Sequence, residues 1–349
     1  MVDYIIVGLG LAGIAFCETL EKHNKTFVVF DNASNASSLV AGGMYNPVIL
    51  KRFTIAWNAQ EQMETANPFY NALEQKLNLK LDYKIPVLRR FTSVEEQNLW
   101  FEASDRRELE NFLSTKLIPN TNISILAPFG YGEVLHTGRV DTALLLKEYA
   151  SYLEKKNVLY KQCFDYRLLQ LYEILIYNKI QAKNIVFAEG FAMNQNPFFD
   201  YLPLDGTKGE LLTIKAPKLK LEYILNASVF IIPLGNDLYK VGATYDWTDK
   251  THTCTAAAKA EILDKLNTLI CCPYELMDHE AGIRPTVKDR KPLVGIHPKH
   301  KNLYILNGLG TRGVILAPQV AKQLYAFIEN RNTIDKEMDV KRYEKLFQK

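Results

Sequence analysis

The chain has 349 residues, of which 48% are hydrophobic and 23% charged, as is usual for a globular protein. This length allows two domains, or one domain that carries a large insertion. The formal net charge is only +3, so the composition does not demand a nucleic-acid partner.

The apolar N-terminus is expected to be neither a signal peptide nor a membrane span. It lacks a basic segment at its start, and Asp3 lies within it. No stretch reaches the ~18 uninterrupted apolar residues of a membrane span. The cysteines, at positions 17, 163, 254, 271 and 272, are odd in number and form no C-x-x-C pair. We therefore expect a cytoplasmic protein with reduced thiols, no disulfide framework and no zinc or other metal site.

The N-terminal stretch predicts a dinucleotide-binding unit. The apolar run Tyr4–Val7 is typical of a buried strand, and three glycines spaced as G-x-G-x-x-G follow it, before a helix expected over residues 12–23. In that motif the first glycine permits a tight turn, the second lets backbone approach a pyrophosphate, and the third lets the helix pack on the strand. The residues expected to face the cofactor here are Gly8, Gly10, Leu11, Ala12 and Gly13.

A second strand and an acid follow in the order that such a fold requires. Residues 26–30 predict a strand that ends at Asp31, where dinucleotide folds hold the adenosine ribose hydroxyls. A carboxylate there repels a 2′-phosphate, which argues against NADP. Alternatively, the glycines only shape a loop and Asp31 only caps a strand.

The stretch from Ser34 to Pro47 is rich in small residues, so backbone could come close to a ligand there. It is either a surface loop or a second cofactor contact facing phosphate or flavin. In the second case the contacting residues are Ser38, Ala41, Gly42, Gly43 and Met44.

The next segments predict a helical region over 54–77 with a break before Pro68, and a strand over 83–91. Ser93 and Glu96 form a capping-box pattern that opens another helix. Further expected elements are a strand over 131–140, a helix over 142–156 capped by Asp141, and strands over 158–163 and 168–176.

Residues 184–190 predict a third strand of the parallel sheet, with Ala188 and Gly190 at the cofactor. Strands then follow at 208–214, 229–233 and 238–245 without helices between them, and a helix covers 256–269. This order is typical of an antiparallel sheet in a separate substrate domain.

A second glycine loop lies in the last third of the chain. It follows a strand at 303–306 and precedes a helix over 314–329. A glycine loop at a helix N-terminus can stabilise electron-rich atoms. The residues expected at the cofactor here are Gly308, Gly310, Thr311, Arg312, Gly313 and Val314.

Taken together, these landmarks resemble the D-amino-acid-oxidase/glycine-oxidase superfamily of FAD-dependent amine oxidoreductases. The matching stretches are the first glycine motif, Asp31, and residues 41–47, 208–210, 242–244, 282–292 and 308–318. The resemblance implies an α/β fold, α+β overall, with a Rossmann-like FAD-binding domain and a largely antiparallel substrate domain. We expect the FAD-binding domain in segments 1–50, 131–205 and 281–349, and the substrate domain in segments 51–130 and 206–280.

The resemblance also implies that a hydride passes from a carbon beside an amine nitrogen to flavin N5, that the imine then hydrolyses, and that dioxygen or another acceptor takes the electrons. This chemistry needs no strong protein base, so no catalytic residue is assigned. Covalently tethered relatives use a Cys beyond the Arg-Pro stretch, which is absent here, so non-covalent FAD is expected. Two further departures are Asp31 in place of the commoner Glu, and Glu189, which either affects cofactor affinity or points outward.

Arg284 is the first candidate for the substrate carboxylate, because a guanidinium binds a carboxylate bidentately. It could instead be structural, beside the flavin or paired with Asp289. Arg312 is a second candidate, for substrate or flavin. The remaining substrate candidates are Lys208, Tyr45 and Tyr245.

Two function classes stay open. The first is oxidation of a small amine or amino acid. The second is tRNA modification, the oxidative removal of carboxymethyl from a carboxymethylaminomethyl-uridine, because the second glycine loop resembles the FAD module of a bifunctional wobble-uridine enzyme. A tRNA substrate needs a basic face and a steep salt dependence. Lys51–Arg52, Arg89–Arg90 and Arg106–Arg107 could supply that face, or could be ordinary solvated charges. FAD as a purely structural ligand is a third, disfavoured alternative.

Overall fold

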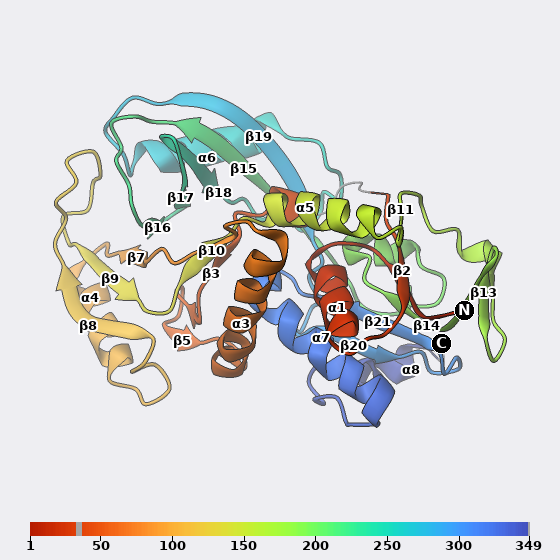
Figure 1. The fold of residues 1–349 in the computed structure, drawn as a ribbon. Coiled ribbons are helices and arrows are strands. Elements are labelled where there is room, and N and C mark those ends of the chain that lie inside the picture. Colours follow the sequence, from red (N-terminus) through yellow and green to blue (C-terminus); the bar gives the residue numbers. More distant parts are fainter. Residues whose placement is uncertain (33–36, 348–349) are drawn as a thin grey trace.

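The computed structural model describes residues 1–32 and 37–347. Within these residues two eight-stranded sheets dominate, and they lie toward opposite ends of the molecule (Figure 1). Both chain ends lie beside the first sheet (Figure 1). The fold is therefore a mixed α/β arrangement, as the sequence predicts.

The first sheet has a parallel centre in the order β11-β2-β1-β14-β21, and three antiparallel strands extend it. Its central strands are buried on both faces, which is why they appear in the sequence as continuous apolar runs. The three predicted parallel strands are confirmed. The strands are β1 (Val2–Val7), β2 (Phe27–Phe30), β11 (Leu159–Tyr160), β12 (Leu169–Gln170), β13 (Leu175–Tyr177), β14 (Ile180–Phe187), β20 (Leu293–Ile296) and β21 (Leu303–Asn307).

The second sheet has the order β19-β15-β18-β17-β16-β7-β9-β8, and all of its pairs are antiparallel except β16 with β7. Helix α6 (Ala256–Asn267) packs on β15 and β18. The antiparallel sheet predicted from residue 208 onward is confirmed. The strands are β7 (Val87–Arg90), β8 (Leu113–Ile118), β9 (Tyr131–Val134), β15 (Thr207–Lys215), β16 (Ile224–Asn226), β17 (Phe230–Gly235), β18 (Leu238–Gly242) and β19 (Glu275–Arg284).

Helices α1 (Leu11–Lys22), α3 (Ala59–Leu77) and α7 (Gly313–Asn330) pack together beside the parallel sheet (Figure 1). Two small sheets lie between the large ones. They contain β3 (Met44–Tyr45), β6 (Asp82–Tyr83) and β10 (Gly138–Val140), and β4 (Val48–Ile49) with β5 (Thr54–Ile55). The other helices are α2 (Ser37–Val40), α4 (Val94–Ser104), α5 (Thr142–Lys155), α8 (Glu344–Phe347) and the 3₁₀ turns Tyr166–Leu168, Gly190–Gln195 and Val340–Tyr343.

The predicted break before Pro68 is wrong, because α3 runs through it without interruption. A proline inside a helix removes one backbone hydrogen bond. Burial of Met63, Tyr70 and Leu73 against the core offsets that loss, and the Tyr70 hydroxyl donates to the Val314 carbonyl at 2.6 Å. Tertiary packing thus overrides local propensity here.

Two predicted strands are each divided in two. Residues 83–91 give β6 and β7, and residues 131–140 give β9 and β10. Ser93 is confirmed as the N-cap, because its Oγ accepts from the Glu96 amide at 3.2 Å. The reciprocal half of the capping box differs, because the Glu96 carboxylate accepts from the Thr92 amide and not from that of Ser93.

The division into FAD-binding and substrate segments stays a prediction. Two elements lie in other surroundings than we expected. Strand β9 pairs with β7 and β8 in the mixed sheet, and α3 packs on α7 beside the parallel sheet. Among the described residues, no helix combines the length and apolar character needed to cross a membrane.

Candidate functional site

The first glycine motif lies where β1, α1 and β14 meet. Gly8 has φ +97°, and a Cβ there would lie 2.5 Å from the Ala188 carbonyl oxygen. A Cβ on Gly13 would lie 2.1 Å from the Gly8 carbonyl oxygen, so helix and strand are too close for any side chain. Around Gly10 the nearest atom to such a Cβ is Ser38 Oγ, at 3.7 Å. The backbone there is open to a ligand, as the motif predicts.

Asp31 follows β2 directly and lies beside this motif. Its Oδ1 accepts from the Leu9 amide at 2.9 Å, and the Gly8 amide donates to Phe30 at 2.8 Å. These bonds hold the carboxylate at the carboxyl end of the sheet, the edge at which dinucleotides bind in such folds. Its contact with a ribose stays a prediction.

The small-residue stretch divides into two parts, and residues 33–36 lie outside the described structure. Ser38 lies in α2, which packs on β19, where a Cβ on Gly282 would lie 3.3 Å from Val40. The space at Gly42 and Gly43 is filled by protein: added Cβ atoms would lie 2.6 Å from Ile232 and 1.8 Å from Val140. No side chain would fit at these two glycines, and their contact with a cofactor through the backbone stays a prediction, whereas Ser38 does lie at the motif. Ala41 and Met44, the remaining members of this stretch, stay predictions.

The second glycine loop adjoins the first. Gly308 and Gly310 have φ of +72° and +55°, and a Cβ on Gly310 would meet nothing within 4 Å. A Cβ on Gly313 would lie 3.3 Å from Leu11, so the N-termini of α7 and α1 are neighbours. The Gly310 amide donates to the Pro285 carbonyl at 3.0 Å, which ties this loop to the end of β19.

The third parallel strand ends in Glu189. Its carboxylate accepts from the Tyr166 hydroxyl and, at 2.7 Å, from Asn196 Nδ2. Burial raises the pKa of Glu189 to about 7, and hydrogen bonds only partly offset the effect. The Glu189 side chain therefore points into the protein and not outward, which was one of the two alternatives from the sequence. The neighbouring Gly190 has φ +58° and open space where a Cβ would stand.

Arg284 is a partly buried cation at the end of β19, and no acidic side chain of the described structure pairs with it. Its guanidinium donates weakly to the carbonyls of Lys208 and Thr244, at 3.3–3.4 Å. Burial lowers the pKa of Arg284. The alternative partner Asp289 is bound instead by Arg342, at 2.9 Å.

Tyr245 lies against Arg284. The guanidinium carbon is 4.4 Å from the centre of the Tyr245 ring, and the tyrosine is 61% exposed. The pair thus places a cation near the surface, with an aromatic ring on one side. The structure brings together these two candidates for substrate binding.

Arg312 is the N-cap residue of α7 and is mostly buried. Its Nη2 is buried without a hydrogen-bond partner in the described part of the chain, and burial lowers the pKa of the guanidinium to about 10. A buried guanidinium nitrogen without a partner calls for an acceptor from a bound molecule.

Two other substrate candidates face elsewhere and are corrected. Lys208 is 1% exposed, and its ammonium binds Asp249 and the Thr253 carbonyl, both at 2.5 Å. The Tyr45 hydroxyl donates to Asp82 at 2.8 Å and accepts from a lysine. Their polar groups are therefore already satisfied by the protein.

Gly209 contacts the candidate Arg284, and sequence reasoning did not single it out. A Cβ there would lie 1.9 Å from the Arg284 guanidinium, so any side chain would displace the arginine. The signal was present in the motif Lys208-Gly209-Glu210, because a glycine inside a strand often marks the close approach of another group.

These residues fit FAD. Open space at Gly10 and Gly310 leaves two adjacent helix N-termini accessible, which suit phosphate and other electron-rich groups. The unpartnered Arg312 nitrogen supplies one further donor. The fold and these features define a flavin-dependent class of protein.

Comparison with known proteins identifies the family. Residues 3–326 match the model of the DAO family, described as FAD dependent oxidoreductase, and the chain belongs to this family. It is therefore an FAD-dependent oxidoreductase.

Two kinds of relative are similar in sequence. Glycine oxidase of Bacillus subtilis is 21% identical over 94% of this chain and 93% of its own. The bifunctional tRNA 5-methylaminomethyl-2-thiouridine biosynthesis protein MnmC of Legionella pneumophila (strain Corby) is 25% identical over 46% of this chain. That match spans only 28% of the length of MnmC.

Solved structures agree on the fold. Glycine oxidase from Bacillus cereus has a TM-score of 0.78 at 18% identity, covering 95% of this chain and 96% of its own. Iminodiacetate oxidase from Chelativorans has a TM-score of 0.77 at 16% identity, covering 98% of both chains.

Proposed function

We propose that the protein oxidises the C–N bond of a small amino acid or secondary amine that carries a carboxylate. The observation that supports this most is Arg284, a partly buried guanidinium without an acidic partner in the described structure. A guanidinium left with only long bonds to carbonyls retains donors for a bidentate carboxylate.

The chain's own residues bind and orient in this proposal. Arg284 holds the substrate carboxylate, and the exposed ring of Tyr245 limits where the rest of the substrate can lie. Of the backbone amides from Gly310 to Val314, those of Thr311, Gly313 and Val314 stabilise negative charge on the cofactor, since Gly310 and Arg312 donate to protein carbonyls. FAD, bound non-covalently, supplies the two-electron acceptor. The amine reacts in its neutral form, so no general base is assigned.

Anaerobic reduction of the purified yellow protein tests the proposal. Glycine, sarcosine, proline and D-amino acids are added one at a time, and loss of the oxidised-flavin absorption is recorded. We expect bleaching by at least one of them, and release of free FAD on denaturation. Colour that stays with the precipitated protein would exclude non-covalent FAD.

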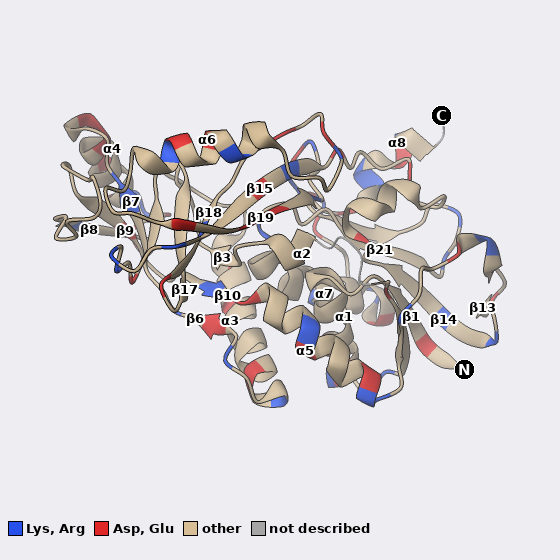
Figure 2. Cartoon of the chain, turned by 90° about the horizontal axis from the view of Figure 1, so that it is seen from above, with Lys and Arg blue, Asp and Glu red and all other residues tan. Residues whose placement is uncertain are grey.

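A second candidate function is modification of a carboxymethylaminomethyl-uridine in tRNA, which the similarity to MnmC favours. Figure 2 shows Lys and Arg interspersed with Asp and Glu along the chain. Of the basic residues expected to bind phosphate, Arg89 pairs with Glu96 at 2.7 Å, whereas Lys51, Arg52 and Arg107 are exposed. Bleaching by undermodified tRNA alone, lost at high salt, would select this function.

A further inference from the structure

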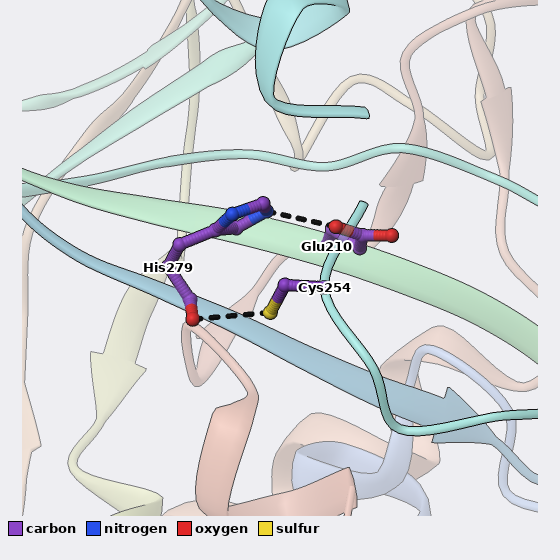
Figure 3. A group of neighbouring side chains, drawn as sticks. All are labelled: Glu210, Cys254 and His279. Atoms are coloured by element: carbon purple, nitrogen blue, oxygen red, sulfur yellow. Dashed lines mark hydrogen bonds and ion pairs between the residues drawn. The ribbon is translucent and has the colours of Figure 1, made fainter. Parts of the chain in front are cut away.

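A group of metal-binding side chains lies on the face of β15 opposite Arg284. Glu210 comes from β15, His279 from β19 and Cys254 from the segment before α6 (Figure 3). One ligand atom of each lies within 4.8 Å of the other two. Successive residues of a strand face opposite sides, so Glu210 points away from the side on which Gly209 contacts Arg284.

The contact between Glu210 and His279 has an unusual geometry. His279 Nε2 lies 2.8 Å from Glu210 Oε2, yet within the described residues Nε2 makes no hydrogen bond. The distance suits a hydrogen bond, so it is the direction of the ring N–H that misses the carboxylate oxygen. Lone pairs of His279 Nε2 and Glu210 Oε2 can then both be directed at one ion. Two tetrahedral ligands at about 2.0–2.2 Å from one ion lie roughly 3.3–3.6 Å apart, so a small outward shift suffices.

Cys254 lies beside this pair. Its Sγ donates to the His279 carbonyl at 3.1 Å, and the thiol forms no disulfide. Lys208 lies 3.4 Å from Oε1 of Glu210 and is closer to Asp249, at 2.5 Å. Oε1 also accepts from the Thr255 hydroxyl at 3.0 Å, and Oε2 accepts from the Thr255 amide at 2.9 Å. A carboxylate oxygen has two lone pairs, so Oε2 keeps one for an ion on the side of the imidazole.

We propose that Glu210, Cys254 and His279 bind one divalent ion of the Zn²⁺ class. Carboxylate, thiolate and imidazole are all zinc ligands, and three of them leave one position for water. On binding, the sulfur–metal bond replaces the S–H bond, and the proton leaves to solvent. The ion ties the segment that carries Cys254 to β15 and β19, and it is independent of the redox site. Sequence spacing offers no such pattern, because the three residues lie at 210, 254 and 279.

Calorimetric titration of the chelator-treated, flavin-loaded protein with Zn²⁺ tests this site. We expect saturable binding of one ion, weakened at least tenfold in both Cys254→Ser and His279→Gln. Cys271→Ser serves as the matched control, because Cys271 is an exposed thiol outside the group, and it should bind Zn²⁺ like the wild type. Absence of saturable binding, or wild-type affinity in Cys254→Ser, would overturn the proposal.

Alkylation of the wild-type protein keeps the test decisive should a variant fail to fold. Zn²⁺ should slow the modification of Cys254 by iodoacetamide at least tenfold, measured by peptide mass spectrometry, and leave Cys271 unaffected. Unchanged labelling of Cys254 at saturating Zn²⁺ would contradict the assignment.

Discussion

Lys208 and Arg284 are both withdrawn from solvent beside β15, but their surroundings differ. The Lys208 ammonium has Asp249 and Glu210 within 2.5 and 3.4 Å. Arg284 has backbone carbonyls and an aromatic ring instead. A buried charge that the protein neutralises already has its partner, whereas one without a counter-charge can still gain one from a ligand. Neighbouring positions of one strand pair thus differ in what they leave to a ligand.

The largest effect is expected on the structural side. Lys208→Met leaves the Glu210 carboxylate buried without its cation, and loss of one partner of a buried pair costs roughly 3–5 kcal/mol of unfolding free energy. We expect the lower end of that range, because Asp249 is 27% exposed. Chemical denaturation measures the loss. Lys220→Met, which breaks an exposed pair, is the control and should change stability little.

On the ligand side, Arg284→Ala should raise KM for a carboxylate-bearing amine more than tenfold. A charge-assisted hydrogen bond contributes about 1.5–3 kcal/mol, and 1.4 kcal/mol corresponds to a tenfold change. Stability and flavin content should stay near wild type, since no protein counter-charge is stranded. Steady-state kinetics provide the measurement, with the exposed Arg167→Ala as control. An unchanged KM would make Arg284 structural.

Glu189 is a third buried ionisable group, an acid that has no cationic partner among the described residues. Its folded-state pKa of about 7 lies above the ordinary glutamate pKa of 4.5, so the folded state binds the proton more tightly. Stability should therefore fall as pH rises from about 4.5 to 7, by up to roughly 3 kcal/mol. Thermal unfolding across this range measures the slope. Glu189→Gln should remove it, and an identical slope in that variant would exclude Glu189 as its source.

The smallest effect is expected at Tyr245. Its ring lies 4.4 Å from the Arg284 guanidinium carbon, and an exposed cation–π contact contributes about 0.5–1 kcal/mol. Tyr245→Ala should therefore raise KM roughly two- to fivefold. Tyr172 has a similar exposure of 64%, and its alanine variant is the control. Equal KM values in the two variants would argue against a role for the stacked pair.

The fold followed from local patterns. Apolar runs of four residues predicted β1 and β2, because parallel strands are buried on both faces. Glycine spacing predicted the turn at Gly8, where φ is +97°, and the close packing of helix on strand at Gly13. Pro68 was misjudged, since its cost is offset by contacts between α3 and α7 that lie far apart in sequence.

The site was harder to predict, because it depends on the direction of side chains. Lys208 was proposed for the substrate, but a shift of one position along β15 puts its side chain on the other face. Gly42 and Gly43 were proposed for the cofactor, and the sequence did not show that protein atoms fill the space where their side chains would lie. Amino-acid composition specifies neither the register of a strand nor which group will lie next to a glycine.

The central claim is that Arg284 selects a substrate carboxylate. Anaerobic flavin reduction by matched pairs tests it most directly: sarcosine against dimethylamine, and glycine against methylamine. The account predicts that the carboxylate-bearing amine of at least one pair bleaches the flavin faster than its partner without a carboxylate. In Arg284→Ala this difference in rate should be lost. Equal bleaching by both members of each pair in the wild-type protein would contradict it.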